Sequence, residues 1–96
     1  MLTLPTSEPW YGMIARREKN EEYRADSPYY DSRFLRYENK RIKIKMRNGY
    51  GANRPSMILT VVPRRRKKGL PEWGAEKDTL YWVLEIWNVE EATPHA

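Results

Sequence analysis

The sequence predicts an α+β fold, namely a small, mostly antiparallel β-barrel with two short helices. The clearest sign is KRIKIKMR, residues 40–47, in which apolar and basic residues alternate as in a strand with one buried face. Residues 57–63 are apolar enough for a buried strand, and residues 79–89 are apolar on both faces, as in the central strand of a barrel. Residues 2–4 alternate like a strand, and residues 18–24 are predicted to form an irregular one.

Two helix starts complete this fold class. The first helix is predicted over residues 8–16, because Ser7 can cap its start and Pro9 falls where no amide donor is needed. The second helix begins at Ser27, which Pro28 follows. Its aromatic residues recur on one face and are predicted to pack in the core: Tyr30, Phe34 and Tyr37.

The length and the scarce residue types limit what the chain can do. The 96 residues predict a single domain, 1–96, with a core at about 2–90 and a flexible tail at 91–96. There is no cysteine, so disulfide bonds and thiolate zinc sites are excluded, and we expect no metal and no cofactor. The only histidine, His95, lies in the predicted tail and is given no catalytic role. A Ser-His-Asp or Cys-His centre is therefore excluded.

The charge balance points to a polyanionic partner. Lysine and arginine number 18 against 13 acidic residues, which gives a formal net charge of +5. Such a balance favours nucleic acid, a nucleotide or an anionic surface. No apolar run approaches the roughly 20 residues of a membrane-spanning helix, and no signal peptide is visible after Met1. We therefore expect a cytoplasmic protein that does not bind membranes.

Basic residues are concentrated in two places. Alternation along residues 40–47 puts four cations on one strand face: Arg41, Lys43, Lys45 and Arg47. Two interpretations stay open for this face, a track for phosphate groups and the solvated face of an edge strand.

The second concentration is a run of five cations: Arg64, Arg65, Arg66, Lys67 and Lys68. Runs of this kind are typical of flexible solvated loops, and many also touch nucleic acid when the protein binds it. Tyr50 and Trp73 lie in nearby loops, where they are candidates for stacking on bases. The two basic segments and the two aromatic residues together predict a nucleic-acid interface.

The segment EKNEEYR, residues 18–24, carries the candidate catalytic residues. In an extended chain Glu22 and Arg24 share one face, and each can fix the position of the other. Lys19 follows the predicted helix end, and a lysine near a carboxylate can carry a proton or act as a nucleophile. The alternative interpretation is a charged surface strand without chemistry.

Ordered motifs around this segment resemble the ASCH family of the PUA-like superfamily, in a short bacterial and phage-type branch. PWYGMIARREKNEEYR is followed by PYYDSRFL, then by RNGYG at 47–51 and EWGA at 72–75. The family motif has the form G-x-K-x-x-E-x-R, and Lys19, Glu22 and Arg24 fall on its lysine, acidic position and arginine. Arg17 stands where the family has glycine. The resemblance covers about residues 2–90.

The resemblance implies a PUA-like barrel with helices packed at its openings and the motif lining a cleft. It also implies binding of RNA or of a modified nucleobase. Some members of the family are enzymes, either amidohydrolases that act on acetylcytidine or ribonucleases. The amidohydrolases have threonine where this chain has Glu22. A glycine in place of Arg17 would allow positive φ where the helix ends.

Three hypotheses follow for the function. The leading one is an ASCH-type domain that binds RNA or a nucleotide in a cleft lined by Lys19, Glu22 and Arg24, with the basic segments adding affinity that does not depend on sequence. The alternative is a small hydrolase that acts on an acylated cytidine or on RNA, with Lys19 as nucleophile or general base. The third is a non-catalytic interaction protein with an acidic protein partner.

Overall fold

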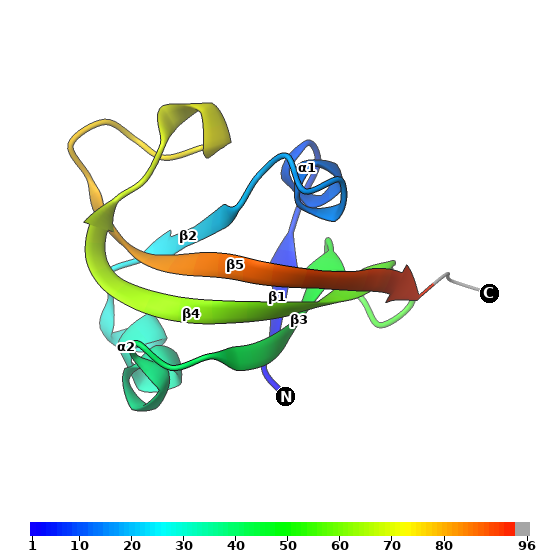
Figure 1. Ribbon diagram of the computed structural model, residues 1–96, viewed down its shortest axis with the longest axis horizontal. Helices are drawn as coiled ribbons and strands as arrows, with labels where there is room; N and C mark the ends of the chain where they lie inside the picture. Colours follow the sequence, from blue (N-terminus) through cyan, green and yellow to red (C-terminus); the bar gives the residue numbers. More distant parts are fainter. Residues whose placement is uncertain (94–96) are drawn as a thin grey trace.

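The computed structural model describes residues 1–93, and the side chains of residues 1–90, as one five-stranded sheet with two short helices (Figure 1). The order of the strands across the sheet is β1-β3-β4-β5-β2. The strands are β1 (Thr3–Thr6), β2 (Glu21–Ala25), β3 (Ile42–Asn48), β4 (Ser56–Lys68) and β5 (Leu80–Thr93). The helices are α1 (Trp10–Ala15) and α2 (Pro28–Phe34), and the turns of 3₁₀ helix are Leu35–Tyr37 and Pro71–Trp73.

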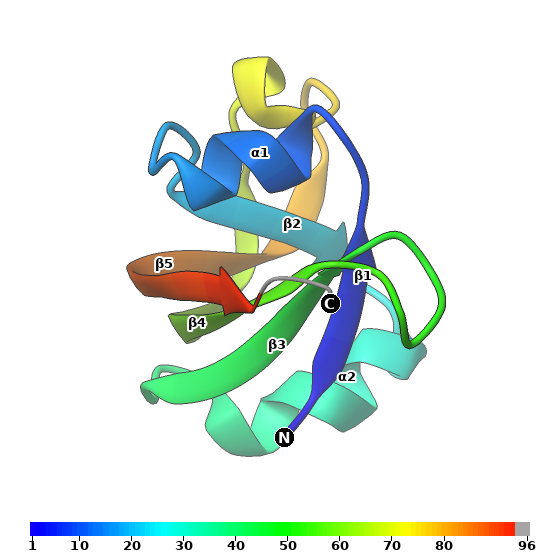
Figure 2. The ribbon, with the colours of Figure 1, turned by 90° about the vertical axis from the view of Figure 1, so that its right-hand side faces the viewer.

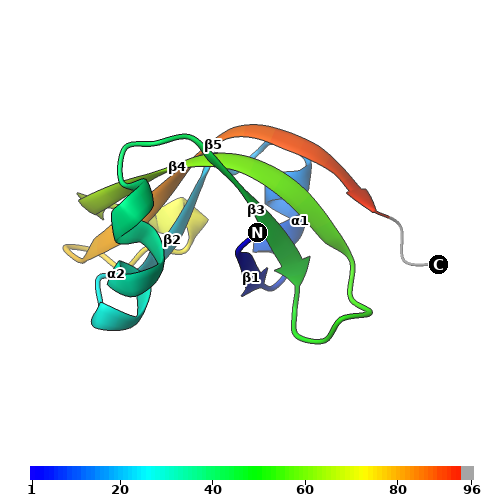
Figure 3. The same cartoon turned by 90° about the horizontal axis from the view of Figure 1, so that it is seen from below.

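The sheet is curled into a half-barrel. Only β1 and β3 pair in parallel, with Thr3 opposite Lys45, and the other three pairings are antiparallel. The long pairing of β4 with β5 contains three register shifts, and both strands bend strongly along their length (Figure 3). This arrangement confirms the predicted α+β fold of mostly antiparallel, barrel-like strands.

The core fills the inside of the curl, and the helices lie at its two ends (Figure 2). The alternation predicted for β3 is confirmed, because Ile44 and Met46 are fully buried while Lys43 is exposed. Helix α1 contributes Ile14 to the core and helix α2 contributes Phe34. The remaining buried members of the core are Leu4, Tyr11, Met57, Leu59, Val61, Trp82 and Leu84.

Helix α1 is shorter than the predicted range 8–16 and begins differently. Pro9 is its N-cap residue, and no side chain caps that position, so Ser7 does not have the expected role. The carboxylate of Glu8 instead accepts a hydrogen bond from the backbone N–H of Gly12 at 2.9 Å. An acidic side chain in this place also suits the positive end of the helix dipole.

Arg17 adopts the conformation that a glycine would favour at the end of helix α1. Its φ is +63°, in the left-handed region. The backbone N–H of Glu18 donates to the carbonyl of Met13 at 2.8 Å, and that of Arg17 donates to Ile14 at 3.0 Å. These two bonds form a Schellman motif, so the helix ends as it would with glycine. The Arg17 side chain also donates to the carbonyl of Val89 at 2.8 Å.

We expect Arg17→Gly to be more stable than Arg17→Ala by about 1 kcal/mol. Both variants lose the bond to Val89, so their difference reports the cost of positive φ alone. Urea denaturation followed by circular dichroism measures it. Arg16, with φ at −86°, is the matched control, and there alanine should be at least as stable as glycine. Equal stability of the two Arg17 variants would contradict this account.

The basic run does not form the predicted loop. Residues 64–68 belong to β4, where Lys67 lies opposite Tyr81 and Lys68 opposite Leu80 of β5. The strand is maintained because carboxylates lie beside the run and reduce the repulsion between the cations. The ion pairs are Arg64 and Lys67 with Glu85, Arg65 with Asp31, Arg66 with Asp26, and Lys68 with Asp78.

Strand β3 is not an edge strand, since it lies between β1 and β4. The interpretation of its cations as protection of a sheet edge is therefore wrong. In the described part of the chain, no helix has the length and apolar character needed to cross a membrane. His95 lies outside the described residues.

Candidate functional site

The candidate site lies at the seam of the half-barrel, where the two edge strands β1 and β2 approach each other. These strands are the ends of the sheet order and do not pair with each other. The guanidinium of Arg24 on β2 bridges the seam, because its Nη2 donates to the carbonyl oxygen of Pro5 on β1 at 2.5 Å. The sheet is thus joined across its opening by a side chain rather than by a backbone ladder.

Strand β2 directs two charged residues toward the interior. Glu22 lies opposite Leu84 and Arg24 opposite Trp82, and both partners are fully buried core residues. The prediction that Glu22 and Arg24 share a face is confirmed, and their carboxylate and guanidinium are 3.0 Å apart. Glu22 is only 7% exposed, so the alternative of a charged surface strand is wrong for this face.

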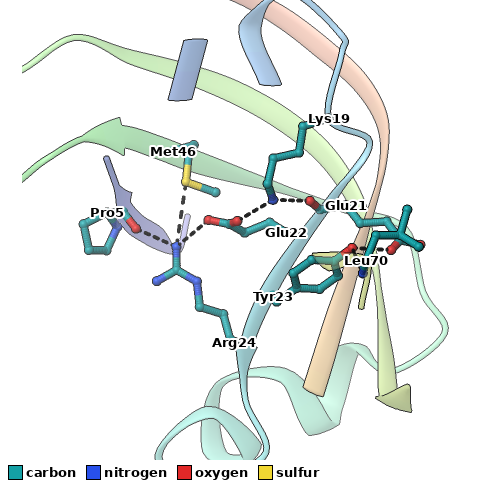
Figure 4. A network of polar contacts seen from close by, with 8 residues as sticks. All are labelled: Pro5, Lys19, Glu21, Glu22, Tyr23, Arg24, Met46 and Leu70. Atoms are coloured by element: carbon teal, nitrogen blue, oxygen red, sulfur yellow. Dashed lines mark hydrogen bonds and ion pairs between the residues drawn. The ribbon is translucent and has the colours of Figure 1, made fainter. Parts of the chain in front are cut away.

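Lys19 is buried and reaches the carboxylate of Glu22 from the side away from Arg24 (Figure 4). Its Nζ donates to Glu22 Oε1 at 2.9 Å and also to the backbone carbonyl of Glu21. The same Nζ lies 4.9 Å from the ring centre of Tyr23 and 5.7 Å from that of Trp10. The ammonium group has three donors, so two hydrogen bonds and the aromatic faces account for all of them.

Lys19, Glu22 and Arg24 therefore form one chain of buried charge. Two cations share one carboxylate, so these three side chains together carry one excess positive charge. Arg24 Nη1 also lies 3.4 Å from the hydroxyl of Tyr30, and its Nη2 lies 4.0 Å from the sulfur of Met46. The excess charge favours an anion or a carbonyl oxygen as ligand.

Tyr23 fixes the loop that covers one side of the site. Its hydroxyl donates to the carboxylate of Glu21 at 2.8 Å and accepts from the backbone N–H of Leu70 at 2.9 Å. Burial raises the pKa of Tyr23, and the neighbouring Glu21 carboxylate raises it further. Gly69 permits this contact, because a Cβ there would lie 2.6 Å from the Tyr23 ring.

A cleft of about 500 Å³ opens above the charged chain. The residues that line it include Glu22 and Arg24 of the charged chain. The aromatic residues that line the cleft are Trp10, Tyr23, Tyr30, Tyr50, Trp73 and Tyr81.

The structure brings some of the predicted site residues together and leaves others apart. Glu22 and Arg24 line the cleft with Tyr50 and Trp73, while Lys19 lies beneath it. The cations of β3 and of residues 64–68 are not among the cleft residues. Four of these lie on the outer face of the sheet, Arg41, Lys43, Lys45 and Arg47, opposite the buried side chains of β3.

Sequence reasoning missed four aromatic residues of the cleft, Trp10, Tyr23, Tyr30 and Tyr81. Tyr30 was predicted to be a core residue from its helical spacing, and it does stack on Phe34 with ring centres 5.7 Å apart. Its hydroxyl end reaches Arg24 all the same. The signal was present in the residue type, since tyrosine has an apolar body and a polar tip that usually finds a partner.

Residues 1–90 contain no group of three or more acidic or histidine side chains that could hold a metal ion. In comparisons with known proteins, no family model matches the chain, and no curated protein or solved structure shows a significant match.

Proposed function

We propose that this chain is an ASCH-type nucleic-acid-binding domain that accepts an unpaired base of RNA, or a nucleotide, in the cleft at the seam. The observation that carries this proposal is that the ion-paired residues Lys19, Glu22 and Arg24 lie next to the aromatic walls of the cleft. Together these three residues are largely buried and carry one excess positive charge. Flat walls suit the π-face of a base, and the charged floor suits its polar edge or its phosphate.

The hydrogen-bonding capacity of the floor supports a nucleobase ligand. Arg24 uses Nη2 on Glu22 and Pro5. Within the described residues its Nε has no hydrogen-bond partner, so this donor can serve a base carbonyl or a phosphate oxygen. Each oxygen of Glu22 accepts one bond from protein and retains capacity for an amino group. A donor and an acceptor side by side match the edge of a base.

The position of Lys19 favours binding over hydrolysis. A nucleophilic or basic lysine must present a free lone pair to its substrate. The Lys19 side chain is fully buried, and its donors are directed at Glu22, Glu21 and two aromatic rings. We therefore assign Lys19 a positioning role: it holds the Glu22 carboxylate toward the cleft.

Binding of nucleoside monophosphates, measured by isothermal titration calorimetry, tests the proposal. We expect Trp73→Ala to weaken the binding roughly 5- to 100-fold, because one stacking wall is lost. Leu35→Ala is the control, since Leu35 is an exposed apolar residue that does not line the cleft, and it should bind as wild type does. Equal binding by both variants, or no binding of any nucleotide by wild type, would contradict the proposal.

Two further experimental results would replace the proposed binding function with one of the other two hypotheses. Turnover of acetylcytidine by wild type, lost in Lys19→Ala, would replace the binding function with the hydrolase. Specific capture of an acidic protein, with no affinity for nucleotides or RNA, would favour the interaction protein.

A further inference from the structure

The outer face of the sheet contains a second hollow, of about 430 Å³, on the side away from the core. The strands that form it are β3, β4 and β5. Thr60 is opposite Lys43 in one pairing and opposite Asn88 in the other, so these three side chains share the outer face. The residues that line the hollow are Arg41, Ile42, Lys43, Thr60, Trp87 and Asn88.

Trp87 is presented to solvent by an irregularity of β5. Thr60 pairs with Asn88 and Val61 pairs with Ile86, so Trp87 is the extra residue of a bulge. Its side chain is 54% exposed, although tryptophan is costly to leave in water. The guanidinium of Arg41 lies over its ring at 4.4 Å from the ring centre. The two groups form a preassembled surface of stacked planes.

Part of the positive charge on this face has no carboxylate partner among residues 1–90. Lys43 forms an ion pair with Glu90 at 2.8 Å. Within residues 1–90, no carboxylate lies within ion-pairing distance of Arg41 or Lys45. Lys43 and Lys45 are alternate residues of β3, so their side chains follow each other at about 6.6 Å along one face. The run on β4 is different, since every one of its cations has a carboxylate partner.

We propose that the outer face is a second binding site, for single-stranded nucleic acid, in which a base stacks on the Trp87–Arg41 pair and the backbone follows Lys43 and Lys45. Aromatic and guanidinium planes bind bases only when the bases are unpaired, so a duplex does not fit. Within residues 1–90 Arg41 and Lys45 of this face have no carboxylate partner, and such cations complement phosphate. The site lies on the face opposite the core, does not include the cleft residues, and does not depend on the function proposed for the cleft.

Fluorescence anisotropy with a labelled 12-residue oligouridylate tests this proposal. We expect Trp87→Ala to weaken binding roughly 5- to 100-fold, and Trp87→Phe to stay within about 3-fold of wild type, because phenylalanine still stacks. Leu80→Ala is the matched control, an exposed apolar residue elsewhere on β5, and should have no effect. Glu90→Gln should tighten binding about 2- to 5-fold at low salt, because it frees Lys43 from its ion pair.

Polyphosphate, a polyanion without bases, separates stacking from charge. Its binding should be unchanged in Trp87→Ala and weakened in the double variant Lys43→Gln/Lys45→Gln. The proposal is overturned if Trp87→Ala binds the oligouridylate as wild type does, or if it loses polyphosphate to the same extent. It is also overturned if Trp87→Phe loses as much as Trp87→Ala. If Trp87→Ala does not fold, the affinities of Trp87→Phe and of Lys43→Gln/Lys45→Gln for the oligouridylate test the proposal. Wild-type affinity of the double lysine variant for the oligouridylate would overturn it.

Discussion

Glu22→Ala is expected to destabilise the fold by about 3–5 kcal/mol, because it leaves buried cations without their shared carboxylate. Glu22 is the only carboxylate that either Lys19 or Arg24 contacts within the described residues. The Lys19 side chain is fully buried, so its ammonium group cannot turn out to bulk water when the partner is lost. A domain of this size has a free energy of unfolding of about 5–15 kcal/mol, so the variant loses a large part of its stability.

Urea denaturation followed by tryptophan fluorescence measures this loss. Glu18→Ala is the matched control, because Glu18 forms an ion pair with Arg16 at 2.8 Å on the exposed surface. Exposed pairs of this kind contribute about 0–1 kcal/mol. Glu22→Gln should fall between the two, since its amide keeps an acceptor for Lys19. If Glu22→Ala were no less stable than Glu18→Ala, the charged chain would not be buried as described.

A second substitution separates two contributions to this loss of stability. One is the absence of the Glu22 carboxylate, and the other is the cost of burying the Lys19 ammonium without a partner. Lys19→Met in the Glu22→Ala background removes the unpaired cation and keeps an apolar chain of similar length. We expect it to recover at least about 1 kcal/mol, as groups in direct contact are coupled by 0.5–3 kcal/mol. A purely additive double variant would indicate that the two residues act independently.

Local signals made most of the fold predictable. The alternation along β3 marks its buried face without reference to any other segment, and Ser27 with Pro28 marks the start of helix α2. The side chain of Ser27 does accept a hydrogen bond, from the backbone N–H of Tyr30. The strand at residues 64–68 was not predictable in this way. It depends on carboxylates distant in sequence, such as Asp26 for Arg66, and a run of cations alone favours a loop.

The candidate site was predictable in its residues but not in its burial. Spacing alone puts Glu22 and Arg24 on one face of an extended segment. That this face turns inward depends on the pairing of β2 with β5, where Glu22 lies opposite the buried Leu84. The contact of Arg24 with Pro5 then closes the seam between strands remote in sequence. The direction of Lys19 depends on the turn at Arg17, where a non-glycine residue takes positive φ. Contacts between segments that are far apart in the sequence cannot be predicted from the spacing of neighbouring residues.

Arg24→Lys is expected to weaken nucleotide binding in the cleft roughly 10- to 100-fold, because hydrogen bonds to a charged group contribute about 1.5–3 kcal/mol. Arginine can bridge Glu22 and Pro5 through Nη2 and still offer donors to a ligand. A lysine ammonium has a similar charge but is a single point with three donors. It cannot hold both strands of the seam and serve the ligand from the same place.

Calorimetric titration of Arg24→Lys with nucleoside monophosphates measures this effect, at a temperature where circular dichroism shows the variant folded. Arg33→Lys is the matched control, because Arg33 lies over the ring of Tyr29 as Arg24 lies over that of Tyr30, and Arg33 does not line the cleft. Binding of polyphosphate should be equal in both variants, since the charge is conserved. If Arg24→Lys bound nucleotides as wild type does, the cleft would recognise its ligand by charge alone. The geometry of the guanidinium would then have no part in recognition.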